Sequence, residues 1–336
     1  MKLSPWPYHL SPKVPKRPSC HIHLDLLQRI SIACNFSAST ARPYRTLDAL
    51  QHVDVGTFRA QYFIPEQPVV LPRGQFRSLS AAKHWFQSDQ SSSVARLNVE
   101  YLQTLAGDAF VPLELTELAN RDSVEKPTPN DIAAHQDVGT DVLSFRQFHA
   151  PLTLFLEWMR KAETSSQAAR LYLAQCQLLD LPQVIRDDFP TPELVLKAGK
   201  GDVYDTNVWI GHAPTYTPLH RDPNPNLFVQ LAGQKIVRLC SPLDGQALFS
   251  KVRRQMGQSG NREAAAFRGE EMMQGQERAL LDEMVWGPAA ASGQKAETKY
   301  EAHLEAGDAL FIPKGWWHSI KGVGEGVTAS VNWWFR

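Results

Sequence analysis

The sequence predicts a mostly β protein, an antiparallel double-sheet jelly roll with supporting helices on its N-terminal side. Two observations lead to this fold class: the apolar segments are short and interrupted by turn residues, and helical patterns precede most of them. The chain has 336 residues, of which 43% are hydrophobic and 10% aromatic, so it can bury a sizeable core.

Composition excludes several classes of protein. The formal net charge is zero, which does not indicate a nucleic-acid or membrane-surface partner. The four cysteines are scattered and form no CxxC pair, which argues against a zinc finger or a disulfide framework. They favour a reducing intracellular compartment, the cytoplasm or the nucleus. No apolar run approaches the roughly 18 residues of a membrane span.

Three regions follow from the changes in composition. Residues 1–45 carry seven Lys or Arg and a single acid, Asp25. Such a segment is typical of a mitochondrial presequence, but its many prolines favour an extension of a cytosolic or nuclear protein, disordered or used for targeting. Residues 46–169 are expected to form the support region. Residues 170–336 are expected to form the barrel, with a surface insertion over 251–296.

The support region is predicted from its N-terminal end. Asp54 is a candidate helix cap before apolar residues at helical spacing. The sequence predicts helices over 54–63, 80–87 and 145–162, strands over 67–72 and 95–102, and a polar loop over 113–141. The helix over 145–162 has the longest apolar stripe, at spacings of three and four residues.

The barrel strands are predicted over 170–178, 203–210, 227–231, 235–240 and 309–312. The segment 232–234 is the turn between two of them, and Pro313 closes the last. Within the insertion, helix-forming residues run from 276 to 284.

The stretch 215–242 holds the densest group of candidate metal ligands. His220 and Asp222 lie two residues apart, so in an extended strand both side chains leave the same face. His318 follows the apolar strand 309–312 and is a third candidate. Two histidines and one carboxylate form the facial triad that suits iron(II) and oxygen chemistry. The alternative is that each histidine is an ordinary loop or packed residue.

Lys235 opens an apolar strand directed into the barrel. A buried ammonium group needs an anionic partner, and a dicarboxylate cosubstrate would supply one. The alternative is an edge-strand lysine whose ammonium group reaches solvent.

The patterns TPLHRDPNPNL, GQK, FIPKGWWH and SVNWW together resemble the JmjC-domain 2-oxoglutarate oxygenases, a group with the cupin (double-stranded β-helix) fold. The nearest resemblance is to the small hydroxylase branch, which includes protein asparaginyl and arginyl hydroxylases and a tRNA hydroxylase. It is strongest from about Tyr172 to the C-terminus.

The resemblance implies a role for each matching residue. His220, Asp222 and His318 would bind iron(II), and O₂ would be the second substrate. Thr217, Lys235 and Tyr172 would bind the distal carboxylate of 2-oxoglutarate. The remaining residues implied are Asn226 and Asn332 near its metal-chelating end, Trp334 in the pocket wall, and Gln175 as a substrate contact.

The expected activity is hydroxylation of a protein side chain, coupled to decarboxylation of 2-oxoglutarate to succinate. The alternatives are a tRNA-modifying hydroxylase, a histone lysine demethylase, a noncatalytic binding protein with this fold, and a cupin that binds metal without 2-oxoglutarate. A tRNA substrate would require a basic surface, for which Lys251, Arg253, Arg254 and Arg262 are the clustered candidates. The oligomeric state stays open.

Overall fold

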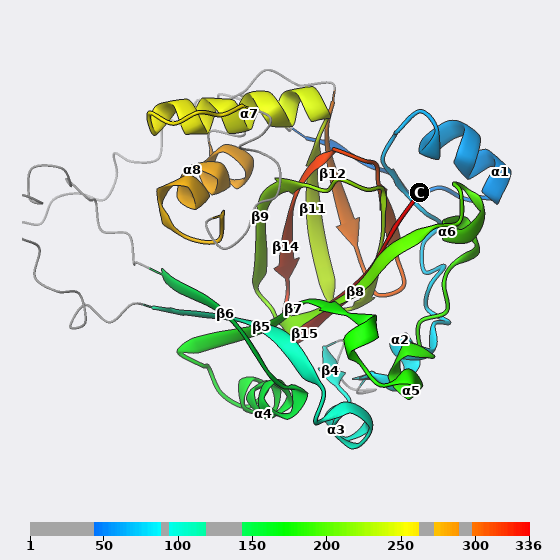
Figure 1. Cartoon of the computed structure of the whole chain (residues 1–336), viewed down its shortest axis with the longest axis vertical. Coiled ribbons are helices and arrows are strands. Elements are labelled where there is room, and N and C mark those ends of the chain that lie inside the picture. Colours follow the sequence, from blue (N-terminus) through cyan, green and yellow to red (C-terminus); the bar gives the residue numbers. More distant parts are fainter. Residues whose placement is uncertain (1–43, 89–93, 119–142, 262–271, 289–297) are drawn as a thin grey trace, which may run out of the picture. The chain divides into compact units, whose positions relative to one another are not determined.

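The computed structural model describes residues 44–88, 94–118, 143–261, 272–288 and 298–336. Two β-sheets form a double-stranded β-helix, which confirms the predicted fold class (Figure 1). Among the described residues, no helix is both long and apolar enough to cross a membrane. Residues 1–43 of the predicted N-terminal extension lie outside the described residues, and its last residue, Arg45, belongs to a strand, Arg45–Thr46.

The smaller sheet has five strands and carries two of the three candidate metal ligands. In spatial order its strands are β1 (Arg45–Thr46), β12 (Lys299–Leu304), β11 (Gln234–Cys240), β14 (Trp317–Val323) and β9 (Thr215–Arg221). All neighbours pair antiparallel except β1, which is parallel to β12.

The larger sheet has eight strands, all paired antiparallel. Their spatial order is β2 (Val69–Val70), β13 (Ala309–Ile312), β10 (Asn226–Ala232), β15 (Val327–Phe335), β8 (Val203–His212), β7 (Ala169–Gln177), β5 (Phe110–Leu118) and β6 (Leu143–Pro151). A hairpin of β3 (Phe86–Ser88) and β4 (Ala95–Leu97) stands apart from both sheets in hydrogen bonding.

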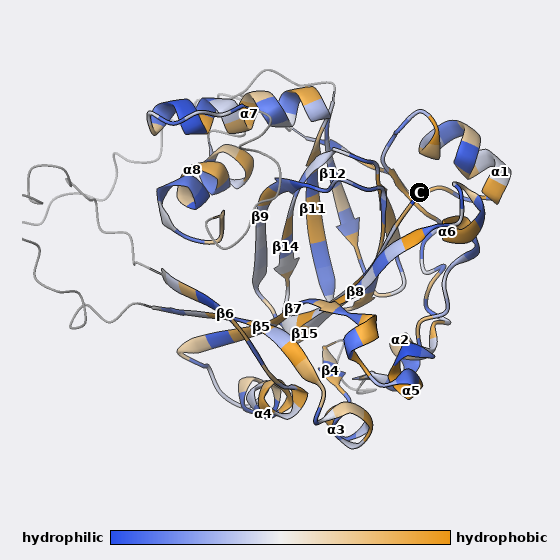
Figure 2. Cartoon of the chain, viewed as in Figure 1, coloured by the Kyte–Doolittle hydropathy of each residue, from blue (hydrophilic) through white to orange (hydrophobic). Residues whose placement is uncertain are grey.

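Helices cover the outer faces of the two sheets. On the larger sheet they are α1 (Val55–Phe58), the π-helix η1 (Arg59–Phe63), α2 (Ser80–His84), α3 (Val99–Ala106), α4 (Leu152–Ala162), η3 (Leu178–Asp180), α5 (Gln183–Arg186) and α6 (Glu193–Lys197). On the smaller sheet α7 (Pro242–Gln255) and α8 (Gly275–Trp286) lie side by side (Figure 1). Figure 2 shows hydrophobic and hydrophilic residues alternating along α7, as expected for a helix with one buried face.

Several predicted elements are confirmed. Asp54 caps α1, because its carboxylate accepts the Thr57 backbone N–H at 2.9 Å. Gly233 has φ +66° in the turn between β10 and β11, a conformation that glycine adopts without steric cost. The helix predicted over 276–284 is found as α8.

Four predicted elements were wrong in part. The helix predicted over 80–87 ends at His84, and Phe86 and Gln87 belong to strand β3, which pairs with β4. The segment 145–162 is a helix only from Leu152, because Pro151 disfavours helical conformation in Ala150, and the residues before it pair with β5 as strand β6. In 95–102 the strand stops at Leu97, where Asn98 caps α3. The predicted polar loop 113–141 is strand β5 as far as Leu118, and its remainder lies outside the described residues.

Candidate metal centre

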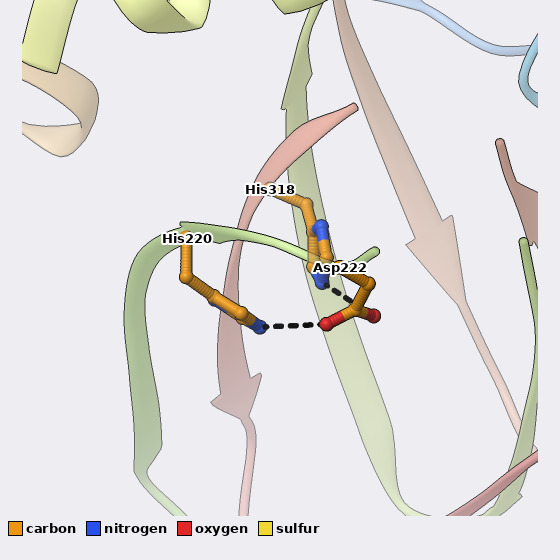
Figure 3. Close-up of side chains that lie close together, drawn as sticks. All are labelled: His220, Asp222 and His318. Atoms are coloured by element: carbon orange, nitrogen blue, oxygen red, sulfur yellow. Dashed lines mark ion pairs between the residues drawn. The ribbon is translucent and has the colours of Figure 1, made fainter. Parts of the chain in front are cut away.

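The three predicted metal ligands converge on one point between the sheets. His220 lies near the end of β9, Asp222 follows that strand, and His318 is the register partner of His220 on β14. His220 Nε2 is 3.9 Å from Asp222 Oδ1, and His318 Nε2 is 3.8 Å from Asp222 Oδ2. The three side chains point toward one another in Figure 3, as ligands of a single ion would.

Backbone carbonyl groups orient both imidazole rings. His220 Nδ1 is 2.8 Å from the Pro218 carbonyl oxygen, and His318 Nδ1 is 3.2 Å from the Trp316 carbonyl oxygen. A carbonyl oxygen only accepts, so each Nδ1 carries the proton and each Nε2 offers its lone pair to the centre. Burial and the neighbouring His220 lower the pKa of His318, which keeps this ring neutral and ready to bind a cation.

The carboxylate of Asp222 is held by two donors from the larger sheet. Its Oδ2 accepts hydrogen bonds from Asn226 Nδ2 at 3.2 Å and from Trp334 Nε1 at 3.1 Å. Asp222 is buried, so these donors replace part of its lost hydration and fix the direction of its oxygens. Asn226 and Trp334 therefore support a metal ligand.

Lys235 lies deep in the same cavity with 2% of its surface exposed. Its ammonium group donates to Ser330 Oγ at 2.7 Å and to the Tyr172 hydroxyl at 3.5 Å, and no carboxylate of the described residues forms an ion pair with it. Burial lowers the pKa of Lys235 to about 7. A buried cation with only neutral partners provides a site for an anionic ligand.

One cavity of about 470 Å³ brings together every residue that the sequence assigned to the site. Its lining includes the metal triad and the seven other candidates, Tyr172, Thr217, Gln175, Asn226, Lys235, Asn332 and Trp334. These positions match the expectation that the residues share one pocket. Their individual roles stay predictions.

Other lining residues were missed by the sequence analysis. Trp209 Nε1 donates to Asn332 Oδ1 at 2.7 Å, and Ser330 holds the Lys235 ammonium group. Ser330 precedes Asn332 by two residues, so strand alternation along β15 could have identified it. Glu114 and Met273 also line the cavity, but they come from β5 and from the segment before α8. No local pattern connects these segments to the triad.

Gln175 enters the cavity wall through an irregularity in β7. The pairing of β7 with β8 shifts register between Leu173 and Cys176, and Gln175 has φ +50°. This conformation is costly for a residue with a side chain and is frequent at functional sites. Gln175 also lines a second cavity of about 400 Å³ that adjoins the first and shares Glu114 and Gln147 with it.

The family model described as "Cupin-like domain" matches residues 56–336. The chain belongs to the cupin-like domain family. It is 26% identical to Lysine-specific demethylase JMJ30 of Arabidopsis thaliana over 82% of this chain and 52% of the relative. It is 26% identical to Lysine-specific demethylase 8 of Xenopus tropicalis, covering 89% and 53%. For Jumonji C domain-containing protein 5 of Drosophila melanogaster the identity is 23%, covering 83% and 57%.

These relatives place the chain among the JmjC-type members of the cupin-like family. The chain spans about half the length of these three relatives. JmjC oxygenases use iron(II), 2-oxoglutarate and O₂, and the cavity fits that set of cofactors. Its donor groups are a facial triad for iron, a buried ammonium for a carboxylate, and the buried Asn332 Nδ2, which lacks a hydrogen-bond partner among the described residues.

Proposed function

We propose that the protein is an iron(II)- and 2-oxoglutarate-dependent oxygenase that hydroxylates a side chain of a protein substrate. The observation that carries this proposal is the combination, in one cavity, of the His220, Asp222 and His318 triad with the buried Lys235 ammonium group. A binding protein that used the barrel only as a scaffold would not need a buried cation beside a metal site. An intracellular location stays a prediction from the cysteine pattern.

The residues of the cavity divide into those for the metal and those for 2-oxoglutarate. The triad would hold iron(II), while Lys235, Tyr172 and Thr217 would bind the distal carboxylate. The Asn332 amide would donate to the other end of the molecule. Bound iron(II) and 2-oxoglutarate would together supply the oxygen chemistry, in which decarboxylation to succinate accompanies hydroxylation of a C–H bond.

A carboxylate shared by the two adjoining cavities favours a protein substrate with a basic side chain. Glu114 and Gln175 line both cavities, and Gln147 Nε2 donates to Glu114 Oε1 at 3.0 Å. Among the described residues that line the two adjoining cavities, the lysines and arginines are Lys235 and Arg221. A carboxylate in the lining attracts a cation, whereas a nucleic-acid backbone would require several basic groups there.

Lysine demethylation is the second candidate. The relatives named lysine-specific demethylases favour it, and the reaction begins with the same hydroxylation, on a methyl group attached to nitrogen. Mass spectrometry of a product peptide separates the two activities, because hydroxylation adds one oxygen and demethylation removes a methyl group.

A tRNA substrate has less support from the described residues. The candidate basic cluster is partly neutralised, since Arg253 forms an ion pair of 2.8 Å with Glu277. Arg262 lies outside the described residues.

The first test is 2-oxoglutarate decarboxylation without added substrate. Purified protein with iron(II) and ascorbate is expected to form succinate slowly, and Asp222→Ala is expected to abolish this turnover by removing the carboxylate ligand. Lys235→Ala should raise the KM for 2-oxoglutarate steeply, by about tenfold or more, because the distal carboxylate loses its charged partner. An unchanged KM would remove Lys235 from the site and favour a cupin that binds metal alone.

If wild type forms no succinate, calorimetry of 2-oxoglutarate binding with and without metal decides between the remaining classes. Absence of metal-dependent binding would favour the noncatalytic reading of the fold.

A further inference from the structure

Strand β9 contains a β-bulge next to the candidate metal ligands. The pairs His220 with His318 and Thr217 with Ile320 are in register, but two residues of β9, Pro218 and Leu219, lie opposite the single residue Ser319 of β14. In a regular strand, residues three apart point to opposite faces. The extra residue allows Thr217 and His220 both to line the cavity.

The bulge also orients a metal ligand directly. The carbonyl oxygen of Pro218, one of the two bulged residues, is the group that accepts from His220 Nδ1. A change in the bulge would therefore rotate the His220 ring and displace its Nε2. The geometry of the triad depends on how firmly these two residues are held.

Ser319 lies opposite the bulge and hydrogen-bonds to the residue before it on the outer face of the sheet. Its Oγ donates to the carbonyl oxygen of Thr217 at 2.8 Å, and Ser319 is completely buried. The same Oγ accepts from Trp286 Nε1 of α8 at 2.9 Å. The path Trp286, Ser319, Thr217 thus joins α8 to both strands that carry the histidine ligands.

Helices α7 and α8 contact alternate residues along the outer face of β14. The Trp317 ring lies 5.3 Å from that of Phe249 on α7, and Lys321 forms a 3.2 Å ion pair with Asp282 on α8. Leu219 of the bulge is buried in the same apolar cluster as Trp317. The helix pair therefore supports the side of β14 opposite to His318.

We propose that Ser319 and Trp286 are positioning residues for the metal centre, and that α7 and α8 act as a buttress for it. They touch neither metal nor substrate. They act by fixing the bulge, which sets the direction of His220 and the side to which Thr217 points. This inference rests on the proposed metal site and adds a role for residues that the reaction itself does not use.

The test is binding of cobalt(II), used as a spectroscopic probe of the apo protein. Trp286→Phe removes the indole donor and keeps an aromatic ring, and Ser319→Ala removes the hydroxyl that joins α8 to Thr217. Each is expected to weaken cobalt(II) affinity by about tenfold and to alter the visible absorption of the complex, as changes behind a metal ligand commonly do.

The matched control is Trp158→Phe. Trp158 is a partly buried residue of α4 whose Nε1 donates to the Ala169 carbonyl oxygen at 3.1 Å, far from the triad in the fold. Trp158→Phe also removes an indole N–H hydrogen bond, so any change in its cobalt(II) binding would report a general loss of stability. Its cobalt(II) affinity and spectrum are expected to match those of wild type.

Wild-type affinity and an unchanged spectrum in folded Trp286→Phe or Ser319→Ala would overturn the positioning role while leaving the metal site intact. The same effect in Trp158→Phe would also overturn it, because a general loss of stability would then explain the result. Failure of the wild type to bind cobalt(II) would instead overturn the metal site of the proposed function.

Discussion

At the scale of single residues, Lys235 predicts how 2-oxoglutarate binding depends on pH. With its pKa lowered to about 7 by burial, the free protein loses the ammonium charge as the pH rises above 7. A dicarboxylate binds the protonated form, so its Kd should be nearly constant below pH 7 and rise about tenfold for each unit above it.

Calorimetry in two buffers with different ionisation enthalpies measures the proton uptake that accompanies this binding. Lys235→Arg is the control, because a guanidinium group stays charged across this range, and its binding should lose the pH dependence. A wild-type Kd that does not change between pH 6 and 9 would contradict the prediction.

The same lowered pKa of Lys235 affects the stability of the free protein in the opposite direction. Between pH 7 and 10.5 the lysine is protonated in the unfolded chain but neutral in the folded protein, so the free energy of unfolding should rise with pH there.

The buried carboxylate of Asp188 is expected to stabilise the fold at a position away from the candidate site. This buried carboxylate accepts from Trp85 Nε1 at 2.9 Å and from the Tyr101 hydroxyl at 2.9 Å, and lies 2.8 Å from His84 Nδ1. Asp188→Ala leaves these groups without their acceptor and should cost about 3 kcal/mol in the free energy of unfolding, measured in urea. The exposed neighbour Asp187→Ala should change it by less than about 0.5 kcal/mol. Equal losses in the free energy of unfolding for Asp188→Ala and Asp187→Ala would contradict a stabilising role for the hydrogen bonds to Asp188.

At the scale of elements, α7 packs on β14 through a residue without a side chain. A Cβ atom at Gly245 would overlap the Trp317 indole, which is itself fully buried. Alanine favours helices more than glycine does, yet Gly245→Ala should lower the free energy of unfolding by about 1–3 kcal/mol through overpacking. Thermal unfolding measures this loss of stability, and Lys251→Ala, a substitution of an exposed residue on the same helix, is the control. A stabilised Gly245→Ala would show that propensity outweighs the contact.

The boundary between β6 and α4 shows why an apolar stripe alone misplaces an element. Phe148 and Leu152 have helical spacing, but Phe148 belongs to a strand that pairs with β5 over its whole length. Only the tertiary pairing decides between the two, and Pro151 was the one local signal of the change.

At the scale of the whole molecule, the sequence was sufficient to predict the barrel and a subset of the residues that line the cavity. The triad and Lys235 could be found because their residue types are few and their spacing matches a known pattern. The support of β14 by α8 could not be found this way. Trp286 and Ser319 are 33 residues apart, and their hydrogen bond depends on where a helix packs rather than on any local periodicity. Glu114 and Met273 likewise line the cavity because of tertiary packing, which no local pattern predicts.

The bulge in β9 divides that strand into two alternation frames. Thr217 lines the cavity before the bulge and His220 lines it after the bulge, although the two residues are three positions apart. Removing one residue, Pro218 or Leu219, would merge the two frames. Every inward side chain of β9 on one side of the deletion would then turn outward, so Thr217 and His220 could no longer both face the cavity. The length of this short segment is therefore as much a part of the site as the identity of its ligands.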